Sequence, residues 1–118
     1  MSHSEDLRQR TRNFAIRIVR LFRALPKSSE AKVMGKQFLR CGTSVAANYR
    51  AVCRARSKAE FVAKLSIVVE EMDETLFWVE FIGDLNLIRP ARLARLSDEA
   101  NQLTAIFVAS RKTSRGVR

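Results

Sequence analysis

The segment "CGTSVAANYRAVCRARSKAEF", residues 41–61, decides the fold because it combines a helical packing pattern with a helix boundary. Apolar residues recur here at alternating steps of four and three, which indicates one buried face of a long helix. Ser57, followed three residues later by Glu60, has the form of a capping box, so a third helix is expected to open there. The second helix should run to about Arg56, with the seam Met34, Phe38, Cys41, Val45, Asn48 and Val52.

The centre of the same segment predicts close helix packing and one buried polar residue. Asn48 stands in an otherwise apolar seam, where an unpaired amide would cost about 1–3 kcal/mol. We therefore expect Asn48 to be a register-fixing core residue, hydrogen-bonded across helices to Glu74 or another polar group of the third helix. Small residues beside it should let a neighbouring helix approach closely: Gly42, Thr43, Ala46 and Ala47.

The flanking segments predict three further amphipathic helices. The first spans about residues 6–25 and stops at Pro26, the third closes at Asn86, and the fourth opens near Pro90, a residue suited to a first helical turn. Because the connections are short, neighbouring helices should be antiparallel, and the sequence predicts an all-α, up-down four-helix bundle. The expected core positions are Leu7, Phe14, Ile18, Leu21 and Leu25, then Phe61, Leu65, Val68, Met72, Leu76 and Val79, and finally Leu93, Leu96, Ala100, Leu103 and Phe107.

Length and composition limit the class of protein. A chain of 118 residues can bury one core, so a single domain over residues 1–118 is expected, ordered over about 6–110 with a frayed basic tail over 111–118. With 4 glycines and 2 prolines the turn-rich all-β class is excluded. No apolar run approaches the roughly 18 residues of a membrane span, so we expect a cytoplasmic protein without a membrane partner.

Catalytic chemistry finds little support in the sequence. The single histidine, His3, falls in an N-terminus expected to be disordered, so neither a histidine-centred triad nor a zinc site is plausible. The acidic residues of the third helix are interpreted as a solvated or ion-paired face, because di-metal sites in bundles need histidines beside the carboxylates. We therefore expect no enzymatic activity, no catalytic residue, no metal and no cofactor.

Charge is strongly segregated along the chain. Residues 1–58 contain 14 basic and 3 acidic side chains, residues 59–88 contain one basic and seven acidic, and residues 89–118 contain seven basic and two acidic. A surface that served only solubility would not separate the two signs in this way. The pattern indicates a polyanionic partner or charge-matched self-assembly.

Two basic stripes contain the candidate nucleic-acid-binding residues. Basic and small residues recur at helical spacing along the first two helices, at Arg10, Asn13, Arg17, Arg20 and Lys27 and at Lys36, Arg40, Thr43, Ala47, Arg50 and Arg54. Because acidic residues are nearly absent from both stripes, we interpret them as surfaces that follow the phosphates of RNA or DNA. The residues expected to bind are Arg10, Arg17, Arg20, Arg40, Arg50 and Arg54. An ordinary solvated face stays open as the alternative.

Three aromatic residues predict a protein contact. Phe77, Trp78 and Phe81 extend the apolar surface of the third helix well around its circumference. A monomeric bundle would leave part of that surface exposed, and exposed patches of this kind usually meet a partner. Self-association through these three residues is the simplest interpretation.

The segment "LRCGTSVAANYRAVCRARSKAEFVAKLSIVVEEMDETLFWVEFI", residues 39–82, resembles the bacterial four-helix-bundle family of ribosomal-RNA intervening-sequence proteins. It is most similar to the branch that contains the accessory variability determinant of diversity-generating retroelements. The similarity is most specific in residues 43–50 and in Glu71, Glu74, Thr75, Leu76 and Trp78. Arg50 departs from the ribosomal-RNA branch, which typically has an acidic residue there, and this departure favours the basic-surface interpretation.

The resemblance implies a non-enzymatic bundle that assembles into a homopentamer. In the retroelement branch it also implies binding to nucleic acid and to a reverse transcriptase. Two hypotheses of different class follow: a nucleic-acid-binding accessory partner of a reverse transcriptase, or a structural homo-oligomer with no direct nucleic-acid role.

Overall fold

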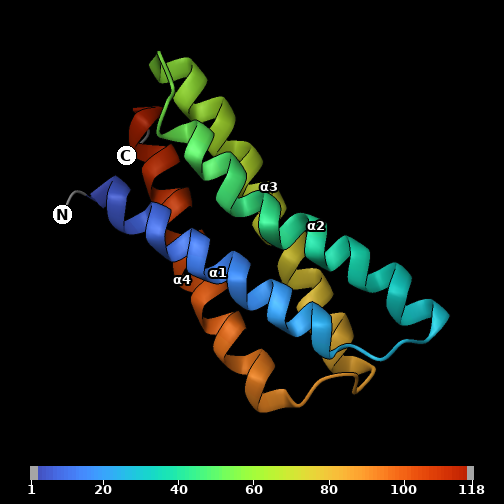
Figure 1. Cartoon of the computed structure of the whole chain (residues 1–118). Helices are drawn as coiled ribbons and strands as arrows, with labels where there is room; N and C mark the ends of the chain where they lie inside the picture. Colours follow the sequence, from blue (N-terminus) through green and yellow to red (C-terminus); the bar gives the residue numbers. More distant parts are fainter. Residues whose placement is uncertain (1–2, 117–118) are drawn as a thin grey trace.

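The computed structural model describes residues 3–116, and in this part of the chain it contains four α-helices and no strand (Figure 1). The helices are α1 (His3–Ala24), α2 (Ser29–Val52), α3 (Lys58–Asp84) and α4 (Pro90–Ser114). Helices that follow each other in sequence pack against each other, and α4 returns to α1. The expected all-α four-helix bundle is therefore confirmed.

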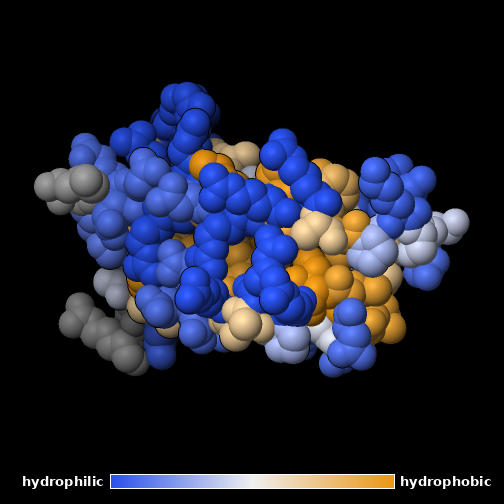
Figure 2. Space-filling model, turned by 60° about the horizontal axis from the view of Figure 1, so that its bottom comes forward, coloured by the Kyte–Doolittle hydropathy of each residue, from blue (hydrophilic) through white to orange (hydrophobic). Residues whose placement is uncertain are grey.

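The two ends of the bundle differ in what they contain. Both termini lie at one end, and the α1–α2 and α3–α4 connections lie together at the other, about 45 Å away along the longest dimension of the molecule (Figure 1). On the face shown in Figure 2, hydrophobic surface gathers toward the end with the two connections, whereas hydrophilic side chains cover most of the rest. We call these the terminal end and the connection end.

Local chemistry sets the helix boundaries. The Ser28 and Ser57 hydroxyl oxygens accept hydrogen bonds from the backbone N–H groups of Ala31 (3.3 Å) and Glu60 (3.0 Å), so the predicted cap at Ser57 is confirmed and Ser28 caps α2 in the same way. Pro90 occupies the first turn of α4, as expected. Helix α3 ends at Asp84, two residues before the predicted closing residue Asn86, whose φ of 57° is a left-handed conformation that asparagine tolerates better than most residues.

Three predicted boundaries are wrong. Helix α1 begins at His3, which is helical rather than disordered. Helix α2 stops at Val52 instead of Arg56, because the backbone tightens there and the N–H groups of residues 54 and 55 bond to carbonyls three residues back. Helix α4 continues to Ser114, beyond the expected limit at residue 110, and residues 117–118 of the expected tail lie outside the described residues.

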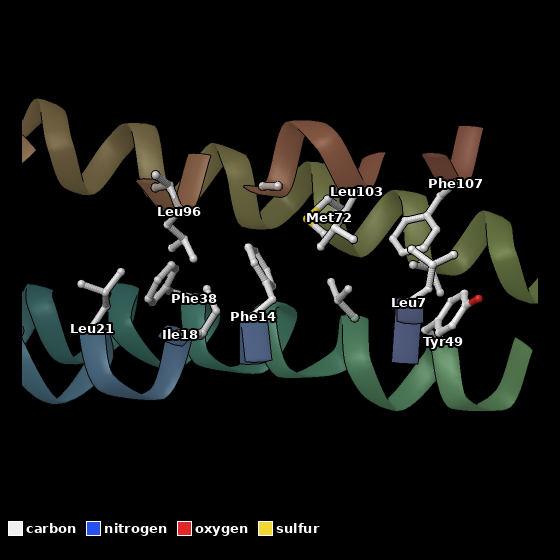
Figure 3. Packing of buried hydrophobic residues seen from close by; sticks show 14 of the residues in the cluster. Leu7, Phe14, Ile18, Leu21, Phe38, Tyr49, Met72, Leu96, Leu103 and Phe107 are labelled. Carbon is white, nitrogen blue, oxygen red and sulfur yellow. The ribbon is translucent and has the colours of Figure 1, made fainter. Parts of the chain in front are cut away.

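Side chains from all four helices form one core between the α1–α2 and α3–α4 layers (Figure 3). All five predicted core positions of α4 are buried: Leu93, Leu96, Ala100, Leu103 and Phe107. Two buried threonines were not predicted. The Thr11 and Thr75 hydroxyls satisfy their hydrogen-bonding capacity by donating to carbonyls of their own helices, at 3.1 Å and 2.7 Å.

The predicted seam of α2 is wrong at one position. Tyr49 is buried, with its ring centroid 5.3 Å from that of Phe107, whereas Asn48 is half-buried beside it. A strict repeat of 3.5 residues drifts by about 20° per heptad on a straight α-helix, so Asn48, two heptads after Met34, lies about 40° to one side of the core-facing line, whereas Val52 returns to it and is buried. The seam predicted from Met34 therefore passes through Tyr49 instead of Asn48.

Gly42 of α2 lies directly against Ile18 of α1. A Cβ atom built on Gly42 would lie 2.7 Å from two carbons of Ile18, a distance that no side chain tolerates without movement. Ile18 is fully buried, so it has no free space into which to move. The expectation that Gly42 permits a close helix approach is confirmed.

Candidate nucleic-acid interface

A groove between α1 and α2 near the terminal end gathers several of the basic residues of the candidate surface. Four arginines line it together with Glu5, and its floor includes Ala46 and Ala47. The groove has a volume of about 580 Å³. We call it the arginine groove, defined by Arg8, Arg12, Arg50 and Arg54.

The small floor residues are what open this groove. Ala46 and Ala47 project only methyl groups into the space between the helices, so the long arginine side chains form its walls. Within residues 3–116, none of the four guanidinium groups of the arginine groove forms an ion pair with a carboxylate. Their N–H donors are therefore available to an anion that enters the groove, and a guanidinium fork matches a phosphate in geometry.

Arg40 was predicted to bind nucleic acid, but it forms ion pairs with two carboxylates of the same chain. Its guanidinium lies 2.7 Å from Glu74 and 3.3 Å from Glu71, both on α3. The hydrogen bond to Glu74 and the two nearby carboxylates raise the pKa of Arg40 and offset its charge. The two acids make Arg40 a weak candidate for binding an external phosphate.

Arg10 has a comparable arrangement on the opposite side of α1. Its guanidinium donates to both carboxylate oxygens of Glu99 on α4, at 2.7 Å and 3.2 Å, and also to Gln102. This bidentate pair is three-quarters buried at Arg10, whose side chain is 27% exposed. Arg10 therefore ties α1 to α4, and its pair with Glu99 makes it a weaker candidate for binding phosphate.

Arg17 and Arg20 lie in a second group of arginines, between α1 and α4. They line a shallow depression of about 180 Å³ with Arg92 and Arg95, above the buried Leu21 and Leu96. None of these four arginines forms an ion pair within the described part of the chain. The predicted stripe on α1 is thus divided: Arg10 is ion-paired with Glu99, whereas Arg17 and Arg20 belong to a separate cluster.

The structure adds four arginines that the sequence analysis did not select: Arg8, Arg12, Arg92 and Arg95. A signal was present, since each pair is spaced by three or four residues and therefore shares a helix face. What the sequence could not show was which faces of α1 and α4 lie beside α2 and beside each other. That depends on how the bundle is closed.

The predicted hydrogen bond between Asn48 and Glu74 is wrong. The Asn48 amide donates to the backbone carbonyl (2.9 Å) and the hydroxyl (2.7 Å) of Ser44, one turn earlier on the same helix. Glu74 accepts from Arg40 instead. Because Asn48 lies beside the core rather than in it, the amide needs no partner from another helix.

The aromatic residues of α3 form a cluster on its outer side. The ring centroids of Phe77 and Phe81 lie 5.8 Å apart in a stacked arrangement, and Trp78 meets Phe77 edge-on at 4.9 Å. Phe77 is 53% exposed and Phe81 is 38% exposed, whereas Trp78 is half-buried against the core. The indole N–H of Trp78 is buried and has no hydrogen-bond partner among the described residues.

Residues 3–116 contain no group of three histidine, cysteine or carboxylate side chains that could hold a metal ion. None of the described helices is both long enough and apolar enough to cross a membrane.

Comparison with known proteins gives the family. The model of the 23S rRNA-intervening sequence protein family matches residues 4–109. The chain is also similar to a crystal structure of a protein of unknown function from the S23 ribosomal protein family of Bacteroides thetaiotaomicron VPI-5482. The TM-score is 0.84 and the identity 31%, over 90% of this chain and 98% of that one. No curated protein matches. Because the family model covers most of its length, the protein belongs to the 23S rRNA-intervening sequence protein family.

Proposed function

We propose that the protein binds RNA or DNA through the arginine groove, as a non-enzymatic accessory protein of the cytoplasm. The observation that carries this proposal is a groove lined by four guanidinium groups, none of which is ion-paired with a carboxylate of residues 3–116. Groups of like charge repel each other when they converge without a counterion, and a phosphodiester backbone supplies that counterion. The sequence offers no aromatic residues between the arginines, so binding should depend on phosphates more than on bases.

A salt titration tests this function. It also distinguishes the arginines of the groove from Arg10 and Arg40, which form ion pairs within the chain. Wild-type protein should bind structured RNA and duplex DNA, with an affinity that falls steeply as salt increases. Replacing Arg12, Arg50 and Arg54 by glutamine should lower the slope of log affinity against log salt by about 0.9 for each lost phosphate contact.

Arg40→Gln is the matched control, because Arg40 is an exposed arginine of the same helix whose charge Glu71 and Glu74 already offset. It should change the slope little. Absence of wild-type binding at about 50 mM salt, where phosphate contacts are still strong, would reject the function. Equal salt slopes for wild type and for the groove variant, in which Arg12, Arg50 and Arg54 are replaced by glutamine, would reject the groove as the site.

We further propose that the chain forms a homo-oligomer, a pentamer by its resemblance to the family, through the surface that includes Phe77, Trp78 and Phe81. The exposure of Phe77 and Phe81 supports a protein contact at this place. Light scattering at micromolar concentration should give a mass well above that of the 13.4 kDa chain. If the protein assembles but binds no nucleic acid, a structural role is the better description.

A reverse transcriptase is the proposed protein partner, because residues 39–82 resemble the retroelement branch and Arg50 departs from the ribosomal-RNA branch. The genomic neighbourhood tests this directly. A reverse-transcriptase gene beside a template and variable repeat pair would support the partnership. A location inside a ribosomal RNA insertion would contradict it.

A further inference from the structure

The outer side of α3 combines exposed phenylalanines with exposed carboxylates. Phe77 and Phe81 are flanked on this side by residues at helical steps of three and four, all of them exposed: Glu70, Asp73, Glu80 and Asp84. None of these four carboxylates forms an ion pair within residues 3–116. We call this surface the knob, defined by Phe77, Phe81 and the four acidic residues.

A surface of the opposite kind lies where α1 connects to α2. A cavity of about 400 Å³ is lined by the apolar residues Phe22, Leu25, Pro26 and Ala31. Phe22 and Leu25 pack over Gly35, where an added Cβ would lie 3.0–3.2 Å from their side chains. The exposed Val33 (65%) extends the apolar surface along α2.

Cations surround this cavity. Arg23, Lys27, Lys32 and Lys36 line its edge, and none of them forms an ion pair in the described structure. We call the cavity and these four residues the notch. An apolar floor with a basic rim is complementary to apolar side chains with an acidic rim, so the notch matches the knob in both respects.

The knob and the notch lie at the same height along the bundle. Arg40 of α2 donates to Glu74 of α3, which places these two residues level with each other. Because the helices are antiparallel and rise by the same 1.5 Å per residue, one further turn toward the connection end reaches Lys36 on α2 and Phe77–Trp78 on α3. The next turn brings Lys32 on α2 level with Phe81 on α3, whereas Glu70 and Asp73 of the knob lie on the terminal side of Glu74.

We propose that the knob of one copy of this chain inserts into the notch of the next copy, with Phe77 and Phe81 seated on the apolar floor and the carboxylates paired with the cationic rim. This inference rests on the proposed self-association and names the two surfaces that make it. The contact is head-to-tail, since a knob facing another knob would bring four carboxylates against four others. Complementary surfaces at one height favour a rotation that closes into a ring over a filament that climbs.

Two variants and their mixture test the proposal. The notch variant, Lys32→Glu with Lys36→Glu, reverses two exposed charges, and the knob variant, Phe77→Ser with Phe81→Ser, removes the exposed apolar surface. Each variant should be a monomer by light scattering, with wild-type helix content by circular dichroism. A 1:1 mixture retains one intact knob and one intact notch, so it should form a heterodimer of twice the 13.4 kDa chain mass and nothing larger.

Each outcome of this experiment decides between specific arrangements. A notch variant that still dimerises alone would indicate a symmetric knob-to-knob contact and overturn the proposal. Wild-type mass in both variants, or no heterodimer in the mixture, would also overturn it. A monomeric wild type would reject self-association itself. The groove variant, Arg12→Gln with Arg50→Gln and Arg54→Gln, is the control. It should keep the wild-type mass even though it binds nucleic acid more weakly, so a failure of binding and a failure of assembly can be told apart.

Discussion

Gly42 determines how closely α1 and α2 pack. Gly42→Ala would add helix propensity of about 1 kcal/mol, but its Cβ would collide with the buried Ile18. Overpacking of this kind costs about 1–3 kcal/mol, so we expect a net loss of stability in urea denaturation. The same glycine change should cost less in an Ile18→Ala background, which provides space for the new methyl group. Equal costs in both backgrounds would contradict a steric origin.

Neighbouring residues of α2 should differ sharply in their effect on stability. Tyr49→Ala removes a buried ring that packs against Phe107 and should cost about 3–5 kcal/mol. Asn48→Ala removes hydrogen bonds within one helix and should stay within about 0.5 kcal/mol of wild type. Urea denaturation of both variants measures the difference. A larger loss of unfolding free energy for Asn48→Ala than for Tyr49→Ala would support the core position that the sequence predicts for Asn48.

The two cysteines should react with alkylating reagents at very different rates. Cys41 is fully buried, and burial raises the pKa of its thiol, so both access and the thiolate fraction are low. Cys53 is exposed just beyond the end of α2. Mass spectrometry after brief iodoacetamide treatment should show one modified site per folded chain, and two after denaturation. Rapid labelling of Cys41 in the folded protein would contradict its burial.

At the scale of the element, capping side chains define where helices begin. Ser57→Ala removes the acceptor for the Glu60 N–H at the start of α3 and should cost about 1 kcal/mol of unfolding free energy. Ser57→Asp keeps an acceptor at the same place and should retain most of the stability. Denaturation of the two variants side by side separates the loss of the cap from a general effect of substitution at this position.

Helix order, caps and most of the core could be predicted because they depend on neighbours in sequence. The five core residues of α4 follow from spacing alone, and Ser57 with Glu60 follows from a local hydrogen bond. The ion pairs of Arg40 could not be predicted in this way. Its partners lie 31 and 34 residues later in the sequence and contact it only when α2 packs on α3. The arginine groove depends likewise on which face of α1 turns toward α2.

At the scale of the whole molecule, assembly and nucleic-acid binding should be coupled through avidity. A long RNA that spans several subunits can occupy several grooves at once, and linked sites of this kind gain about 10²-fold or more in affinity. The knob variant, Phe77→Ser with Phe81→Ser, changes no charge and leaves the groove intact. It should lose that gain for long RNA but keep wild-type affinity for an oligonucleotide short enough for one groove. Equal losses for both lengths would contradict the coupling.

In a ring whose axis runs along the helices, the placement of both termini at one end of the bundle gives two unlike rims (Figure 1). The arginine groove lies toward the terminal end, since Arg8 is in the second turn of α1 and Arg54 follows the end of α2. The knob and the notch lie toward the connection end. One rim would therefore hold the subunits together while the other displayed every groove in the same direction. A nucleic acid could then be held on a single side of the assembly, leaving the opposite side open to a different macromolecule.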